Sequence, residues 1–193
     1  MEAGDALRGC IPVLVTPFAA DGSLDLASLE RQIDWVIAEG AAGVACVAIA
    51  SEGYKLTEDE RDAVIQTTVL HVAGRVPVVA SADGPAEEPA VSRAQRAARL
   101  GADTLMALPP YFVKPDPDAL VSYYTRLAEA AAIPIMLQDA PQLTGVPMSP
   151  ALWARMAKAV PGLRYIKAEG MPQGATISET RRLCGDRLGL FCG

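Results

Sequence analysis

The sequence predicts an α/β protein with the fold of a (β/α)8 TIM barrel, and three features support this. Strand-like and helix-like segments alternate with a period of roughly 25 to 35 residues, which is typical of βαβ units. The strand-like segments are apolar without alternation, as strands covered by helices on both faces must be. Gly-Ala pairs before strands and prolines near strand starts recur regularly, which favours a barrel over a doubly wound sheet.

Each expected element follows from the spacing of apolar residues and from the polar residues that end it. The expected strands are 10–15, 43–48, 76–80, 103–108, 133–137, 163–167 and 188–192. The expected helices are 26–37, 57–71, 86–100, 117–131, 150–160 and 175–184. The second helix should open with a capping box, Thr57 to Glu60. No glycine fingerprint for a dinucleotide follows the first strand, which weakens a Rossmann alternative.

The length of the chain sets a limit on this barrel. It has 193 residues, enough for six units and one further strand, whereas a complete barrel typically takes ~250. We therefore expect one barrel domain over residues 1–193, truncated after about six and a half units. Its edge strand would be unpaired, so the isolated chain should be poorly soluble or depend on a partner.

Composition narrows the class of protein. The net charge of −6 argues against nucleic acid and acidic membranes as partners. No apolar run approaches the ~20 residues of a membrane span, and Met1–Asp5 does not resemble the start of a signal peptide. The cysteines are scattered, without metal-like spacing: Cys10, Cys46, Cys184 and Cys192. We expect a cytoplasmic protein with reduced cysteines, no metal and no other cofactor.

The segment 163–170 carries the main chemical hypothesis. It reads as a short strand that ends in Lys167, followed by Glu169 and Gly170. A lysine at this position lies at the carboxyl edge of a parallel sheet, where active sites of such folds are built. Apolar neighbours would lower the pKa of its amine and allow it to attack a ketone. The alternative is a solvated lysine at a strand end.

Polar residues follow several other expected strands and should converge on the same edge. They are Thr16, Ser51, Glu52, Tyr111, Gln138, Asp139 and Glu169.

With these residues in place, the sequence resembles the dihydrodipicolinate synthase/N-acetylneuraminate lyase family of class I Schiff-base lyases. The motifs that carry the resemblance are 12–18, Glu52 with 56–61, 109–112, Pro141 with 144–145, and 165–167. The resemblance implies a barrel, an imine between Lys167 and an α-keto acid such as pyruvate, and a homodimer or homotetramer.

The departures from the family pattern are as informative as the matches. The loop that usually reads Gly-Thr-Thr-Gly-Glu falls on 48–52, and both threonines are gone. The usual proton-relay tyrosine falls on Gln138, and the arginine that binds a dicarboxylic aldehyde falls near Leu143. The second aromatic of the Pro-Tyr-Tyr motif is Phe112, which has no hydroxyl. These changes argue against dihydrodipicolinate synthesis and resemble the 2-keto-3-deoxy-L-arabonate dehydratase branch.

Candidate roles in substrate binding follow as hypotheses. Ser51 and the backbone around it, including Ala50, could hold the substrate carboxylate, with Thr16 nearby. Ser51 could equally cap the following turn. For Glu52, a structural role is favoured over a catalytic one, with its carboxylate accepting hydrogen bonds from N–H groups of the loop.

Candidate roles in catalysis centre on Lys167 as nucleophile. Glu169 or Asp139 could be the acid/base that replaces the missing tyrosine. For Glu169, a structural role in which its carboxylate ties down loop N–H groups is an equal alternative. Gln138 can orient a hydroxyl but cannot transfer a proton near neutral pH. Tyr111 is more often a packing residue than a proton relay in such a turn.

The resemblance therefore implies a lyase that dehydrates a 2-keto-3-deoxy sugar acid to a keto-acid semialdehyde. One alternative keeps the imine but cleaves a carbon–carbon bond, as a pyruvate-dependent aldolase does. Another is a keto-acid-binding homologue without catalysis, which the lost threonines and tyrosine would fit.

Overall fold

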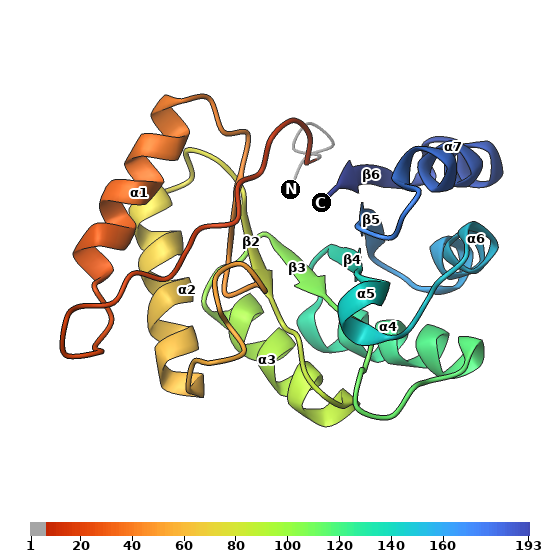
Figure 1. The fold of residues 1–193 in the computed structure, drawn as a ribbon, viewed down its shortest axis with the longest axis horizontal. Helices are drawn as coiled ribbons and strands as arrows, with labels where there is room; N and C mark the ends of the chain where they lie inside the picture. The colour runs from red at the N-terminus through yellow and green to blue at the C-terminus, as the bar shows by residue number, and fades with distance from the viewer. Residues whose placement is uncertain (1–6) are drawn as a thin grey trace. The chain divides into compact units, whose positions relative to one another are not determined.

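The computed structural model describes residues 7–193, in which parallel strands alternate with helices (Figure 1). The strands are β1 (Val44–Cys46), β2 (Val78–Ser81), β3 (Thr104–Ala107), β4 (Ile135–Asp139), β5 (Leu163–Ala168) and β6 (Gly189–Cys192). The helices are α1 (Leu26–Ala38), α2 (Glu58–Val72), α3 (Glu87–Arg99), α4 (Pro117–Ala131), α5 (Pro141–Thr144), α6 (Pro150–Ala159), α7 (Gln173–Cys184) and the 3-10 turn η1 (Gly185–Arg187). The Met1–Asp5 segment, on which the expectation about a signal peptide rests, lies outside the described residues.

Backbone contacts divide the chain into two compact units. Among the described residues, the first comprises 7–81 and 96–104, and the second comprises 82–95 and 105–193. Among residues 7–193, no helix combines the length and apolar character needed to span a bilayer.

The first unit holds a parallel strand pair covered by two helices. β1 and β2 pair with Val44 opposite Val78, and both strands are fully buried. α1 and α2 pack side by side, in the orange and yellow part of Figure 1. The predicted capping box is confirmed: the Thr57 hydroxyl accepts from the Glu60 N–H, and the Glu60 carboxylate accepts from the Thr57 N–H.

The second unit holds four parallel strands, β3 to β6, in chain order. α6 and α7 pack against each other and against β5, in the blue part of Figure 1. The hydroxyls of Tyr123 and Tyr124 on α4 donate to the Leu108 and Ala107 carbonyls, 3.0 and 3.1 Å away. These two bonds fix the carboxyl end of β3, from which the segment carrying Tyr111 departs.

Three expectations about strands need correction. Segment 10–15 forms a single bridge, from Val13 to Ala45, rather than a strand, because Pro12 has no N–H to continue a ladder. β1 ends at Cys46 because Val47 turns to a left-handed φ of 49°. β4 runs on through Gln138 and Asp139, which were expected in a loop.

The helix predictions hold closely. α4 has the expected bounds, and α1, α3, α6 and α7 differ by a few residues at most. The Asp25, Asp116 and Ser149 side chains cap α1, α4 and α6 respectively. The short helix α5 was not expected. All four cysteines are free, as expected.

Candidate active site

Lys167 lies near the carboxyl end of β5, and its ammonium is paired with a carboxylate. The Nζ atom is 3.1 Å from Oε1 of Glu169, and the two side chains are 19% and 22% exposed. The strand places both residues here: Lys167 is in the ladder, and Glu169 follows directly after its last residue. The interpretation of Lys167 as a freely solvated strand-end lysine is therefore wrong.

Gln138 stands directly opposite Lys167 in the ladder between β4 and β5. Its side chain is buried, and its Nε2 donates to the same Oε1 of Glu169 at 2.6 Å. One carboxylate oxygen thus accepts a hydrogen bond from an amide and forms an ion pair with an ammonium. This arrangement holds the Glu169 carboxylate in place beside the lysine.

Asp139 follows Gln138 and is only 3% exposed. Its Oδ1 is buried and has no hydrogen-bond partner among the described residues. Burial, and to a lesser extent the charge of Glu169, raise the pKa of Asp139 to about 7. A carboxyl group of this kind can donate or accept a proton near neutral pH.

Gly193 packs against the lysine and was not foreseen from the sequence. Its N–H donates to the Ala168 carbonyl at 3.1 Å. A Cβ at this position would lie 2.7 Å from Cε of Lys167 and would also collide with Cγ of Glu169. Only a glycine fits here without displacing the pair. A Gly just after a strand is too common a pattern to reveal this.

Tyr111 does not join this cluster by any hydrogen bond among the residues described. It is partly exposed in the segment after β3, and its carbonyl accepts from Nζ of Lys114 at 2.5 Å. Its neighbour Phe112 is 83% exposed. A proton-relay role for Tyr111 stays a prediction.

The first unit carries the other predicted residues: Ala50, Ser51 and Glu52 lie in the loop after β1, and Thr16 lies in the segment before α1. The Thr16 hydroxyl donates to the Ser51 carbonyl at 2.6 Å, so these two residues are brought together. Ser51 is 1% exposed, and its Oγ has no partner within the described chain. Ala50 is exposed. Glu52 is also exposed and pairs with Lys55 at 2.9 Å, which favours the structural interpretation of this residue.

Arg61 on α2 also contacts this loop, and its role was missed. It is 2% exposed and donates to three backbone carbonyls: Val47, Gly53 and Ser81. The signal that could have found it is its place on the buried face of α2, with Val64, Ile65, Thr68 and Val72. A charged residue at a core position of an amphipathic helix requires specific partners.

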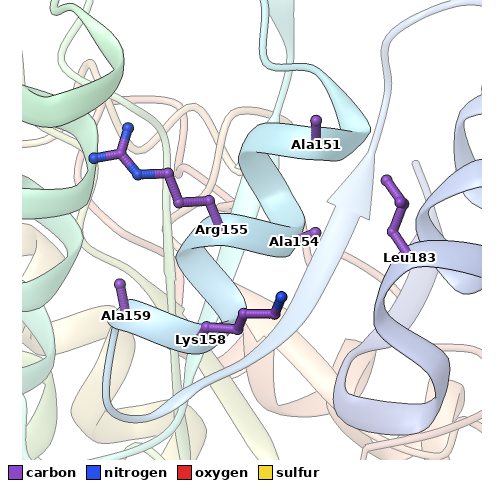
Figure 2. Close-up of a pocket in the computed structure, with 6 residues that line it drawn as sticks. All are labelled: Ala151, Ala154, Arg155, Lys158, Ala159 and Leu183. Atoms are coloured by element: carbon purple, nitrogen blue, oxygen red, sulfur yellow. The ribbon is translucent and has the colours of Figure 1, made fainter.

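A separate hollow of about 480 Å³ lies on the second unit, between α6 and α7 (Figure 2). It is lined by Ala151, Ala154, Arg155, Lys158, Ala159 and Leu183, none of which was predicted as a site residue. In the described part of the chain, no three or more His, Cys, Asp or Glu side chains gather where they could hold a metal ion.

Comparison with known proteins decides the family. The profile of the dihydrodipicolinate synthetase family matches residues 6–193. The chain belongs to this family. Its similar relatives include an L-2-keto-3-deoxyarabonate dehydratase of Azospirillum brasilense, 40% identical over 185 residues. They also include a 4-hydroxy-tetrahydrodipicolinate synthase of Chelativorans sp., 35% identical over 178 residues.

Matches to the family cover nearly all of this chain but only part of each relative. The two alignments cover 94% and 92% of this chain, and 59% and 60% of the dehydratase and the synthase. The chain thus spans less than two thirds of the length of these family members.

Solved structures of the family confirm the predicted fold class. The dihydrodipicolinate synthase of Acinetobacter baumannii, complexed with pyruvate, matches with a TM-score of 0.93 at 27% identity. The enzyme of Aquifex aeolicus matches with a TM-score of 0.91 at 28% identity. Each match covers 97% of this chain, and 64% and 63% of the solved chains. The six strands and their helices therefore correspond to that share of the family's (β/α)8 barrel.

Proposed function

We propose that this chain belongs to a lyase whose Lys167 forms a Schiff base with an α-keto acid and which dehydrates a 2-keto-3-deoxy sugar acid. The observation that carries the proposal is the shared carboxylate oxygen: Oε1 of Glu169 is ion-paired with Lys167 and accepts a hydrogen bond from Gln138. It gives the lysine an adjacent base at the strand end where the family resemblance puts the imine.

The first steps form the imine. Glu169 takes a proton from the Lys167 ammonium, and the free amine attacks the C2 carbonyl of the keto acid. Loss of the carbonyl oxygen as water gives a protonated imine. Gln138 cannot take part in these transfers, because an amide does not exchange protons near neutral pH, but it keeps Glu169 within reach.

The protonated imine withdraws electrons from C3, and this makes the elimination possible. A carboxylate, Glu169 in our proposal, removes a proton from C3, and the electrons move into an enamine. The enamine expels the C4 hydroxyl, which leaves as water after it receives a proton from a carboxylic acid. Asp139, with a pKa of about 7, fits the role of this acid.

The imine is now conjugated to a C3–C4 double bond and must isomerise: C5, which bears the remaining hydroxyl, loses a proton and C3 gains one. The resulting C4–C5 enol takes up a proton at C4, loses its hydroxyl proton and becomes the aldehyde. Hydrolysis of the imine then frees the semialdehyde and restores the lysine.

Binding of the C1 carboxylate is assigned to the loop after β1. The buried Ser51 hydroxyl without a partner supports this role, and Thr16 supports the loop by its bond to the Ser51 carbonyl. In a (β/α)8 barrel the loops after all strands open on the same face. We also propose a cytoplasmic homodimer or homotetramer, as the family resemblance implies.

A second candidate is a pyruvate-dependent aldolase, which the 35% identity with 4-hydroxy-tetrahydrodipicolinate synthases favours. It would share the imine but break the bond between C3 and C4. Its products from a sugar acid would include pyruvate, whereas the dehydratase yields a semialdehyde and no pyruvate.

The test combines trapping with product analysis. The protein is incubated with pyruvate and borohydride, and the adduct is located by mass spectrometry. We expect it on Lys167, absent in Lys167→Ala and present in the matched control Lys158→Ala, which changes an exposed lysine. 2-Keto-3-deoxy-L-arabonate should then give a semialdehyde. An adduct with no product, or no adduct at all, would support a keto-acid binder instead.

A further inference from the structure

The loop after β1 is held in a strained conformation. Val47 and Glu52 both have left-handed backbones, with φ of 49° and 57°. This region is unfavourable for residues other than glycine, and most of all for β-branched residues such as valine. Such strain persists only where surrounding contacts fix the backbone, and it often marks functional sites.

Arg61 supplies these contacts from the first turn of α2. Its Nη1 donates to the Gly53 carbonyl at 2.8 Å and to the Val47 carbonyl at 3.4 Å. Its Nη2 donates to the Ser81 carbonyl at the end of β2, at 2.6 Å. One buried guanidinium thus joins both ends of the loop to the neighbouring strand. A lysine could not reproduce this, because its single nitrogen lacks the planar fork.

Gly53 lies close to both Val47 and Arg61, where a side chain would not fit. A Cβ at Gly53 would collide with the Val47 carbonyl and lie 2.9 Å from Nη1 of Arg61. The Gly53 N–H donates to the Ala48 carbonyl at 3.0 Å, and the Glu52 N–H donates to Ile49 at 2.9 Å. The loop is therefore tightly determined between its ends.

These contacts fix the position of Ser51. Thr16 holds the Ser51 carbonyl, while the Ser51 hydroxyl is buried and unpartnered within the described chain. Buried hydroxyls nearly always have a partner in folded proteins, so this one points to a ligand that supplies an acceptor.

We propose that Arg61 is a positioning residue that shapes the 47–53 loop to bind the carboxylate of the keto acid. It acts through the backbone of the loop rather than by touching the substrate. This inference rests on the proposed function, since it needs a keto acid as ligand. It assigns to Arg61 a share in the selection of carboxylate-bearing ketones over simple carbonyl compounds.

The experiment compares two probes that form imines with the lysine amine. Pyruvate carries a carboxylate and acetaldehyde does not. Borohydride trapping is titrated with each probe on the wild-type chain, Arg61→Lys and Arg61→Met. We expect the pyruvate concentration for half-maximal trapping to rise ~10- to 100-fold in both variants, because the loop is misplaced. The acetaldehyde titration should stay unchanged.

Two further variants separate positioning from general stability. Thr68→Val removes a buried hydrogen bond of the same helix, from the Thr68 hydroxyl to Val64 at 2.7 Å, and leaves the bonds from Arg61 to the loop in place. It should trap pyruvate as the wild type does. Gly53→Ala disturbs the loop while retaining Arg61, and should weaken pyruvate trapping as the Arg61 variants do, even if those fail to fold.

The outcomes are distinct. Unchanged pyruvate trapping in Arg61→Met and Gly53→Ala would overturn the positioning role, and so would equal weakening for both probes. Absence of any adduct in the wild type would overturn the proposed function, and this inference with it.

Discussion

Gln138 and Lys167 face each other across the ladder between β4 and β5, and both bind Oε1 of Glu169. The family's relay tyrosine is expected at position 138, so a side chain that cannot move a proton has taken its place. What the amide does is hold a carboxylate beside the amine. In the proposed mechanism, proton transfer is therefore assigned to Glu169, the residue just after β5.

Glu169→Gln should separate imine formation from elimination. The variant keeps the size of the side chain but loses the base, so we expect semialdehyde formation to fall ~100-fold or more. The pyruvate adduct should still accumulate on Lys167, although more slowly, because solvent must then take the proton from the ammonium. The rate of product formation and the mass of the adduct check this. Glu129→Gln, at an exposed carboxylate on α4, is the matched control and should be near wild type. Equal activity in both variants would assign Glu169 to structure alone.

Asp139→Asn should change how stability depends on pH. The pKa of Asp139 is about 7 in the folded protein, against an ordinary value of 3.8. Between these values the folded state binds more protons than the unfolded state, so this group lowers the free energy of unfolding as pH rises from about 4 to about 7. The Asn variant lacks this dependence.

We therefore expect Asp139→Asn to unfold at a higher urea concentration than the wild type at pH 8, with the difference shrinking toward pH 4. Glu129→Gln, at an exposed position on α4, should show no such trend. A constant difference at every pH would mean that Asp139 is ionised throughout this range.

Gly193→Ala should impair the lysine without changing any group that reacts. The added methyl would meet Cε of Lys167 at 2.7 Å, so the amine must move. We expect the rate of pyruvate trapping to fall ~10- to 100-fold, since catalytic geometry tolerates little displacement. Gly174→Ala is the matched control, because a Cβ there meets nothing within 4 Å. If both variants trap pyruvate at the same rate, the approach of Gly193 does not constrain the site.

Thr57→Ala should weaken the first unit through its capping box. The Thr57 hydroxyl accepts from the N–H of Glu60, and the loss of such a cap costs about 1 kcal/mol. Urea unfolding would report this as a lower midpoint. Gln66→Ala, at an exposed position of the same helix, should leave the free energy of unfolding, and with it the midpoint, nearly unchanged. No loss in Thr57→Ala would show that the Glu60 side chain caps the helix alone.

The helices and buried strands could be predicted because their signals are local. Capping residues, prolines at first turns and apolar spacing identified α2 and α4 at their start. The segment around Pro12 was mistaken for a strand because its composition is strand-like, while a single missing N–H limits its pairing.

The chemistry of the site could be predicted only in part. Lys167, Gln138 and Glu169 were identified as candidates, yet their shared oxygen depends on the β4–β5 register, which no local pattern fixes. Gly193 and Arg61 were missed because their roles are contacts over a long sequence distance. Arg61 and Gly193 bond to backbone carbonyls, which every residue has, so the sequence does not identify these partners.

The hydrogen bond from Gln138 to Glu169 also constrains how such sequences can diverge. Position 138 is 1% exposed and its amide is bonded to Glu169, so a larger side chain there, such as tyrosine, would have to displace a neighbouring group. The two positions should therefore covary: glutamine with a glutamate two residues past the lysine, tyrosine with a different residue. Comparing the residues at positions 138 and 169 among aligned homologues should then separate them by reaction type more reliably than percentage identity does.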